Sequence, residues 1–220
     1  MLEAIKQILK SQAAEETNVP QFGDFDLNHN LKPIFEKEVE QGSMRKAAAL
    51  IPLVLDKDEI FVFMTKRPAN FKAHPNLWCF PGGKQDATDS SSKAAALREA
   101  NEEIGITSDD VTILGKLPNF WVCSDIEGKS GFNLSPYVGV LKEPLKLTLN
   151  PDEVVETIKL PLTFILDKKN CSVVDGDYCF NYKNAVIKGA SPALLVMLRN
   201  LMPNHKISNS NKLLTKLFRL

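Results

Sequence analysis

The chain has 220 residues, 44% of them hydrophobic, which is enough for one well-packed domain with extensions. Lys and Arg together number 27, as do Asp and Glu, so no overall charge draws the protein to nucleic acid or acidic membranes. No apolar run approaches the roughly 20 residues that span a bilayer, and the N-terminus lacks the continuous apolar core of a signal peptide. The four cysteines lack Cys-x-x-Cys spacing, which favours free, buried thiols over disulfides or zinc. We therefore expect a soluble intracellular protein that binds neither nucleic acid nor membranes.

The N-terminal part is predicted to be a helix followed by a surface segment. Apolar residues recur at helical spacing from Leu2 to Leu9, so residues 2–16 are expected to form an amphipathic helix packed on the domain or on a partner. Residues 18–43 are polar and interrupted by Pro and Gly, which is typical of a long surface segment.

Two short apolar runs come next, Ala47–Leu55 and Ile60–Met64, separated by the polar residues 56–58. Their length and their Ile, Val and Phe content predict two β-strands joined by a tight turn rather than a helix. These strands would lead the chain to a glycine-rich turn.

Basic residues lie just before that turn. Residues 67–75 include Arg67, Lys72 and His74, a pattern equally typical of a solvent-exposed loop and of a loop that contacts substrate. The turn reads Pro81-Gly82-Gly83-Lys84, in which proline fixes φ while the glycines can adopt conformations closed to other residues and let a ligand approach the backbone.

A short helix follows the turn. Asp89 and the serines at 90–92 can cap its first turn, Lys93–Glu103 is rich in helix formers, and Gly105 is a natural stop. At about 100° per residue, its apolar side chains fall on one face and three glutamates on the opposite, exposed face. The glutamates are Glu99, Glu102 and Glu103.

These carboxylates predict a metal site. Arg98 stands four residues before Glu102, a spacing that lets the two side chains pair. Three carboxylates so close would repel one another unless a cation lay between them. Mg²⁺ and Mn²⁺ prefer such oxygen ligands, and Mg²⁺ commonly joins one or two carboxylates to substrate phosphates. A glutamate-rich helix by itself is more often a solvated face, but the adjoining Pro-Gly-Gly turn and Arg-Glu pair favour the metal site.

This segment resembles the Nudix box, which runs Gly, five residues, Glu, seven residues, then Arg-Glu-aliphatic-x-Glu-Glu-x-Gly-aliphatic. The residues that fill it are Gly83, Arg98, Glu99, Ala100, Glu102, Glu103, Gly105 and Ile106. Two departures, Asp89 as the first acid and eight residues between it and Arg98, resemble the coenzyme A diphosphatase branch of the family. The run Phe63–Arg67 and the run Cys79–Gly83 are similar to that branch's second signature, although Lys72, Asn76 and Trp78 replace the expected Arg, Gly and Val.

The resemblance implies metal-dependent hydrolysis of coenzyme A or acyl-coenzyme A to 3′,5′-ADP and (acyl-)4′-phosphopantetheine. Glu99, Glu102 and Glu103 would bind Mg²⁺ or Mn²⁺, Glu102 or Glu103 would accept a proton, and Arg98 would hold Glu102. Glu153 or Glu156 could add a fourth acid, since Nudix enzymes often recruit one from a distant loop. The residues expected to bind substrate are Arg67, Lys72, Gly82, Gly83 and Lys84. Two alternatives are a Nudix diphosphatase for another nucleoside diphosphate, such as ADP-ribose, and a non-catalytic binding module with the Nudix fold.

Strands dominate the rest of the chain. Residues 111–122, 134–141 and 158–162 read as strands, with Phe120 and Trp121 in or near the cleft, where an aromatic is more often core than a base-stacking platform. This order of strands and helices predicts a mixed β-sheet with helices on both faces, in agreement with the α/β/α Nudix sandwich that the resemblance implies.

The C-terminal part is predicted to add a hairpin and two helices. Cys171–Tyr182 contains an Asp-Gly turn, and residues 184–188 would supply an edge strand. Ser191 would cap a helix over Pro192–Leu201, and apolar residues at helical spacing predict a further docked helix over residues 212–220.

The predicted division is an N-terminal helix and surface segment (1–43), a Nudix domain (44–203) and a C-terminal helical tail (204–220). The chain ends in Phe218-Arg219-Leu220, which resembles a peroxisomal import tripeptide except for the bulky Phe218. We expect a peroxisomal location, with the cytoplasm as the alternative.

Overall fold

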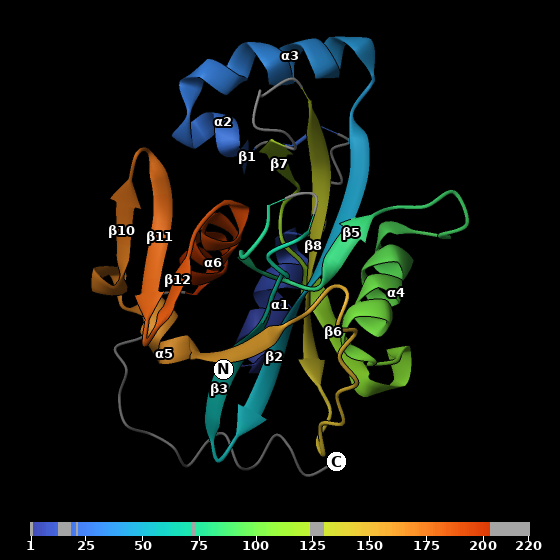
Figure 1. The fold of residues 1–220 in the computed structure, drawn as a ribbon, viewed down its shortest axis with the longest axis vertical. Helices are drawn as coiled ribbons and strands as arrows, with labels where there is room; N and C mark the ends of the chain where they lie inside the picture. The colour runs from blue at the N-terminus through green and yellow to red at the C-terminus, as the bar shows by residue number, and fades with distance from the viewer. Residues whose placement is uncertain (1, 13–18, 21, 72–73, 124–129, 203–220) are drawn as a thin grey trace.

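The computed structural model describes residues 2–12, 19–20, 22–71, 74–123 and 130–202. A nine-stranded mixed β-sheet forms its centre, with one helix packed on one face and further helices on the other (Figure 1). This arrangement is the α/β/α sandwich that the sequence predicts.

Strand β2 (Arg45–Asp56) organises the sheet. It pairs in parallel with β8 (Gly131–Leu141) and antiparallel with β3 (Glu59–Lys66) and β5 (Gly82–Lys84). Lys57 and Asp58 both have positive φ, 47° and 69°, and form the tight turn predicted between the first two strands. The remaining strands of this sheet are β1 (Phe22–Gly23), β4 (Trp78–Cys79), β6 (Val111–Lys116), β7 (Phe120–Cys123) and β9 (Glu156–Pro161).

The single strand predicted over residues 111–122 is wrong, because the structure divides it into β6 and β7. Pro118 lies between the two strands and has no N–H for a β-ladder. The chain therefore changes course there, so that both strands pair with different parts of β8.

Helix α4 (Ser92–Ile104) covers one face of the sheet. Its N-cap is Ser91, whose Oγ accepts a hydrogen bond from the N–H of Ala94 at 3.1 Å, and Gly105 ends it with φ of 73°. The buried side of the helix, which includes Ala100 and Ile104, packs on β2. The predicted helix and both of its end signals are confirmed.

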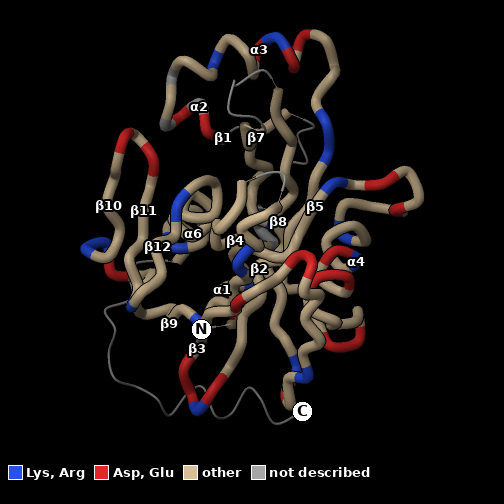
Figure 2. The backbone as a smooth tube through the Cα atoms, viewed as in Figure 1, with Lys and Arg blue, Asp and Glu red and all other residues tan. Residues whose placement is uncertain are grey.

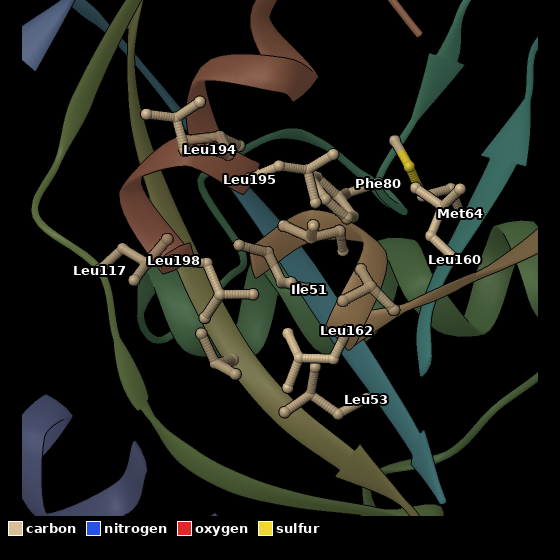
Figure 3. Packing of buried hydrophobic residues seen from close by; sticks show 14 of the residues in the cluster. Ile51, Leu53, Met64, Phe80, Leu117, Leu160, Leu162, Leu194, Leu195 and Leu198 are labelled. Atoms are coloured by element: carbon tan, nitrogen blue, oxygen red, sulfur yellow. The ribbon is translucent and has the colours of Figure 1, made fainter. Parts of the chain in front are cut away.

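The opposite face carries α1 (Leu2–Gln12), α5 (Leu162–Leu166) and α6 (Ala190–Leu201). Ile5 and Leu9 of α1 are fully buried in the same core as Leu198 of α6, which Figure 3 shows packing close to Leu117. Each such side chain contributes about 1.5–3 kcal/mol by leaving water. The amphipathic N-terminal helix is thus confirmed as part of the domain.

The start of α6 differs from the prediction. Its N-cap is Gly189, at φ of 81°, and Ser191 lies inside the first turn instead of capping it. Positive φ favours glycine at the cap, so the turn does not need a serine there.

The expected surface segment over residues 18–43 is also corrected. It contains α2 (Asp24–Leu27), the 3₁₀ turn η1 (His29–Leu31) and α3 (Lys32–Gln41). Glu38 of α3 is 7% exposed, and its carboxylate accepts hydrogen bonds from Trp121 Nε1 at 2.8 Å and from the N–H of Gly131 at 3.0 Å. Pro33 lies in the first turn of α3, where proline is compatible with a helix rather than breaking it.

A smaller three-stranded sheet lies beside α6, formed by β10 (Cys171–Val174), β11 (Asp177–Tyr182) and β12 (Ala185–Ile187). Asp175 and Gly176 both have positive φ and form the predicted Asp-Gly hairpin turn. The four cysteines carry free thiols, of which only Cys179 is buried. The other 3₁₀ turns are η2 (Ser108–Asp110) and η3 (Lys168–Asn170), and the predicted tail over residues 204–220 lies outside the described residues.

Candidate active site

The glycine turn is pressed between strand β2 and helix α4. A Cβ atom on Gly82 would lie 2.5 Å from the carbonyl oxygen of Ala48, and one on Gly83 would lie 2.5 Å from Glu99 Oε1. Neither glycine has the left-handed φ expected from the sequence. The turn therefore requires glycine for lack of space, and this closeness brings the backbone against the carboxylate of Glu99.

Arg98 joins the acidic groups around this turn. Its Nη1 donates to Glu99 Oε1 and Glu102 Oε2, each at 3.0 Å, so the pairing predicted from the four-residue spacing is confirmed. Its Nε and Nη2 donate to the two oxygens of Asp89 at 3.1 and 3.0 Å, and Nη2 also donates to the carbonyl of Lys84 at 2.9 Å. Such multiple charge-assisted bonds fix the helix to the loop before it.

Asp89 has a different place from the helix cap that the sequence allowed. Its side chain is 6% exposed, and the hydrogen bonds from Arg98 hold its pKa below the usual range. Asp89 thus pairs with Arg98 across the loop that precedes the helix.

Glu103 is buried, contrary to the expectation that all three glutamates share an exposed face. It is 6% exposed, and its Oε1 accepts a hydrogen bond from the N–H of Gly82 at 3.1 Å. Burial raises its pKa to about 7, although the Gly82 N–H and the charge of Arg67 oppose that shift. The turn folds over this part of α4 and removes Glu103 from water.

The other two glutamates differ from each other. Glu99 lines the cleft beside Gly83, and burial raises its pKa against the opposing charge of Arg98. The side chain of Glu102 is 50% exposed and is held by Arg98 outside the lining of the cleft. Figure 2 shows several acidic positions along α4 and a further acidic stretch just before β9.

The structure separates the two candidates for a fourth acid. Glu153 lines the cleft, and its negative charge contributes to the raised pKa values of Glu99 and Glu103. Glu156 lies in β9, where its exposed carboxylate pairs with Lys66 Nζ at 3.1 Å. Only Glu153 of these two therefore reaches the site.

A cleft of about 730 Å³ extends from this acidic end. Of the five residues predicted to bind substrate, Gly82, Gly83, Lys84 and Arg67 line it, while Lys72 lies outside the described residues. The Arg67 guanidinium also lies 4.5 Å from the centroid of the Phe71 ring, which lines the cleft as well. These positions favour a loop that faces substrate.

The aromatic residues of β7 belong to the core. Phe120 is 3% exposed and Trp121 is fully buried, and neither lines the cleft. Phe132 of β8 lines it instead, with the Arg45 guanidinium 4.1 Å from its ring centroid. The core interpretation of the two β7 aromatics is thus confirmed.

The residues at the other end of the cleft come from the N-terminal and C-terminal parts of the chain and were not predicted from the sequence. No motif marks them, and only the tertiary fold brings them together. They are Asp24, Asn28, Asp177, Lys188 and Ser191.

A family model described as "NUDIX domain" matches residues 44–163, which are more than half of the chain. The chain belongs to the NUDIX family. Two bacterial relatives, both called uncharacterized Nudix hydrolase NudL, come from Enterobacter sp. (strain 638) and Cronobacter sakazakii. The Enterobacter protein is 37% identical over 133 residues, which cover 60% of this chain and 65% of that protein. The Cronobacter protein is 38% identical over 120 residues, which cover 54% of this chain and 59% of that protein. The match thus spans less than two thirds of each relative.

A solved NUDIX domain shows the same fold. The NUDIX domain of Shewanella oneidensis NrtR, in complex with ADP ribose, superposes with a TM-score of 0.50 over 71% of this chain and 87% of its own, at 15% identity.

The peroxisomal location expected from the C-terminal residues is wrong. The NUDIX relatives are bacterial proteins, and bacteria have no peroxisomes. Within the described residues, no helix combines the length and apolar character needed to cross a membrane.

The donors at the acidic end of this NUDIX cleft suit Mg²⁺ or Mn²⁺ as a partner shared with substrate. Among the described residues, no three Asp, Glu, His or Cys side chains are arranged to hold a metal by themselves. Mg²⁺, however, usually takes one or two carboxylates and completes its coordination with water and substrate phosphates. The half-buried Glu99 and the buried Glu103 fit this mode because both line the cleft beside the glycine turn, where substrate phosphates could complete the coordination of the ion.

Proposed function

We propose that this chain hydrolyses the diphosphate bond of coenzyme A or acyl-coenzyme A, giving 3′,5′-ADP and (acyl-)4′-phosphopantetheine. The observation that supports a diphosphatase is the Arg98 network, which holds three acidic side chains against a glycine turn at one end of a cleft. A binding module without chemistry would have no need of this arrangement. The eight-residue spacing from Asp89 to Arg98 and the upstream signature favour coenzyme A.

The residues at the acidic end divide the work. Glu99 and Glu103, which line the cleft, would hold Mg²⁺ or Mn²⁺, the ions that NUDIX hydrolases generally use. Glu102, the third ligand expected from the sequence, lies outside the lining of the cleft. When bound, the ion would neutralise phosphate oxygens and lower the pKa of water. Arg98 keeps Glu99 and Glu102 in position through its two 3.0 Å hydrogen bonds.

Hydrolysis also needs a proton acceptor. Water attacks one phosphorus atom, the bridging P–O bond breaks, and the proton of the water passes to a carboxylate. Glu102 and Glu103 remain the proposed acceptors within α4, and Glu153 is the candidate outside it. Glu103 and Glu153 line the cleft, which favours these two over Glu102.

Basic groups near the turn would bind the phosphates. Arg67 and Lys84 both line the cleft, on either side of the glycine turn. Coenzyme A carries a 3′-phosphate in addition to its diphosphate, so it offers these cations one more anionic group than ADP-ribose does. A charge-assisted hydrogen bond contributes about 1.5–3 kcal/mol, so we expect kcat/KM to fall about tenfold or more for the analogue that lacks the 3′-phosphate. Equal kcat/KM for coenzyme A and this analogue would favour a diphosphatase of broader substrate range.

The test is a substrate panel with products identified by mass. Coenzyme A, an acyl-coenzyme A and ADP-ribose are incubated with the protein and Mg²⁺, with the Glu103→Gln variant as the blank. The expected products from coenzyme A are 3′,5′-ADP and 4′-phosphopantetheine. Their masses together equal the mass of coenzyme A plus one water. Cleavage of ADP-ribose alone would replace the proposal with the alternative diphosphatase, and binding without any cleavage would favour the non-catalytic module.

A further inference from the structure

The cleft continues well beyond the acidic end. We call its opposite part the far end, defined by Asp24, Asn28, Asp177, Lys188 and Ser191. These residues come from α2, the segment before η1, β11, the link between β12 and α6, and the first turn of α6. All of them lie outside the segment that matches the NUDIX family model. The far end is therefore an addition to the catalytic domain.

Ser191 is an unusual member of the far end. It is 8% exposed and lines the cleft, yet its hydroxyl has no hydrogen-bond partner within the described residues. Among the described residues, the buried side-chain atoms without a partner do not include Ser191 Oγ, so this oxygen is open to the cleft. It can therefore donate a hydrogen bond to a group bound there.

The first turn of α6 adds donors beside this hydroxyl. Gly189 provides no side-chain cap, so the N–H groups of Ala190 and Ser191 have no acceptor in their own helix. Gly189 and Ala190 both line the cleft, and so does Lys188. The far end thus presents several hydrogen-bond donors.

The far end also contains acceptors. Asp24 Oδ2 accepts a hydrogen bond from the N–H of Cys123 at 2.7 Å, whereas its Oδ1 has no partner within the described part of the chain. Asp177 adds a second carboxyl group, close enough for its charge to act on Asp24. Apolar side chains, including Leu77, Val122 and Leu194, complete the wall.

This mixture suits amide groups better than ions. The two carboxyl groups would repel a phosphate, while Lys188 and the N-terminus of α6 would repel a cation. An amide is neutral and carries one N–H and one C=O, so it needs both an acceptor and a donor. A chain of amides joined by methylene groups would also need the apolar wall.

We propose that the far end binds the amide-bearing pantetheine arm of the substrate, with Ser191 donating to an amide oxygen and Asp24 accepting from an amide N–H. This inference rests on the proposed coenzyme A hydrolysis for the identity of the arm. It assigns the selection of that arm to the N-terminal and C-terminal additions, and not to the NUDIX segment.

The test measures product binding by calorimetry on the full chain. Ser191→Ala removes a hydroxyl with no partner in the protein, so folding loses no hydrogen bond, and Asp24→Asn keeps an acceptor for Cys123. Ser172→Ala on the hairpin and Asp26→Asn on α2 are the matched controls, because neither residue lines the cleft. Loss of one hydrogen bond should raise the Kd for 4′-phosphopantetheine about fivefold in each far-end variant. The Kd for 3′,5′-ADP should stay unchanged.

Two results would overturn the proposal. One is an unchanged Kd for 4′-phosphopantetheine in both far-end variants, and the other is an equal change for both products. Failure of the proposed function would be a separate result. The wild-type protein would then cleave no coenzyme A, but it would still bind 4′-phosphopantetheine, and Ser191→Ala would still weaken that binding. Such a protein would have the arm site without the reaction.

Discussion

The two ends of the cleft satisfy their polar groups in different ways. At the acidic end, Arg98 occupies oxygens of Asp89, Glu99 and Glu102, and Gly82 donates to Glu103. At the far end, the Ser191 hydroxyl and one oxygen of Asp24 have no partner within the described residues. The difference indicates that the protein orders its reacting groups before substrate arrives, whereas it leaves the recognition of the substrate arm to be completed by the substrate.

Among these changes, Glu103→Gln at the acidic end should have the largest effect on turnover. Glutamine can still accept the hydrogen bond from Gly82, so the fold should survive while a proposed metal ligand loses its charge. We expect kcat to fall by about 100-fold or more, a typical loss for removing one electrostatic group from an active site. Glu156→Gln, an exposed glutamate on β9, is the matched control. Near-wild-type turnover of Glu103→Gln at saturating metal would reject the site assignment.

Arg98→Lys should have the next largest effect. Lysine keeps the charge but cannot donate in the fork that binds Asp89 while also holding Glu99 and Glu102. Because Glu99 and Glu102 would lose their orientation, we expect kcat to fall about tenfold to 100-fold, the range for groups that orient metal ligands. Steady-state kinetics and a thermal melt would separate this loss from unfolding. A variant with unchanged kcat would show that the network only stabilises the helix.

Glu38→Ala tests how α3 is anchored to β7 and β8. The change leaves two buried donors, Trp121 Nε1 and the Gly131 N–H, without their acceptor. We expect the free energy of unfolding to fall by about 2–3 kcal/mol, measured by urea denaturation. Glu40→Ala, an exposed position on the same helix, should change it by less than about 0.5 kcal/mol. Equal losses in the two variants would mean that α3 is not anchored through Glu38.

Asp24→Asn should have the smallest effect and should depend on pH. Burial raises the pKa of Asp24 to about 7, and the negative charge of Asp177 adds to the shift. The folded protein therefore binds more protons than the unfolded chain between about pH 4 and pH 7, so wild-type stability falls as the pH rises through that window. The free energy of unfolding of the asparagine variant should not fall with pH in this way. At about pH 8 it should exceed that of the wild type by on the order of 1 kcal/mol. Parallel stability profiles of the two proteins would contradict the burial of this carboxyl group.

The same contrast between the ends explains what the sequence could reveal. The acidic end comes from one continuous segment, so helical periodicity and the four-residue spacing of Arg98 and Glu102 predict its main contacts. Burial of Glu103 could not be predicted, because it depends on the glycine turn folding back over α4. Periodicity places a side chain on a helix face but does not say what covers that face.

The far end could not be predicted for a stronger reason. Asp24 and Ser191 are separated by most of the chain, and each occurs in a stretch without a recognisable motif. Local composition also failed to predict α3. Pro33 and Gly42 suggested an irregular surface segment, although they lie at the two ends of a helix. Long-range assembly, and not local propensity, determines this part of the cleft.

The most direct test of the account is a competition between coenzyme A and ADP-ribose for the wild-type protein in one Mg²⁺-containing reaction. Both substrates contain the diphosphate that the acidic end would cleave, but only coenzyme A carries the amide-bearing arm that the far end would bind. We predict that kcat/KM for coenzyme A exceeds that for ADP-ribose by about tenfold or more, since each additional hydrogen bond contributes about 0.5–1.5 kcal/mol. Equal values, or a preference for ADP-ribose, would contradict the assignment of coenzyme A as the substrate.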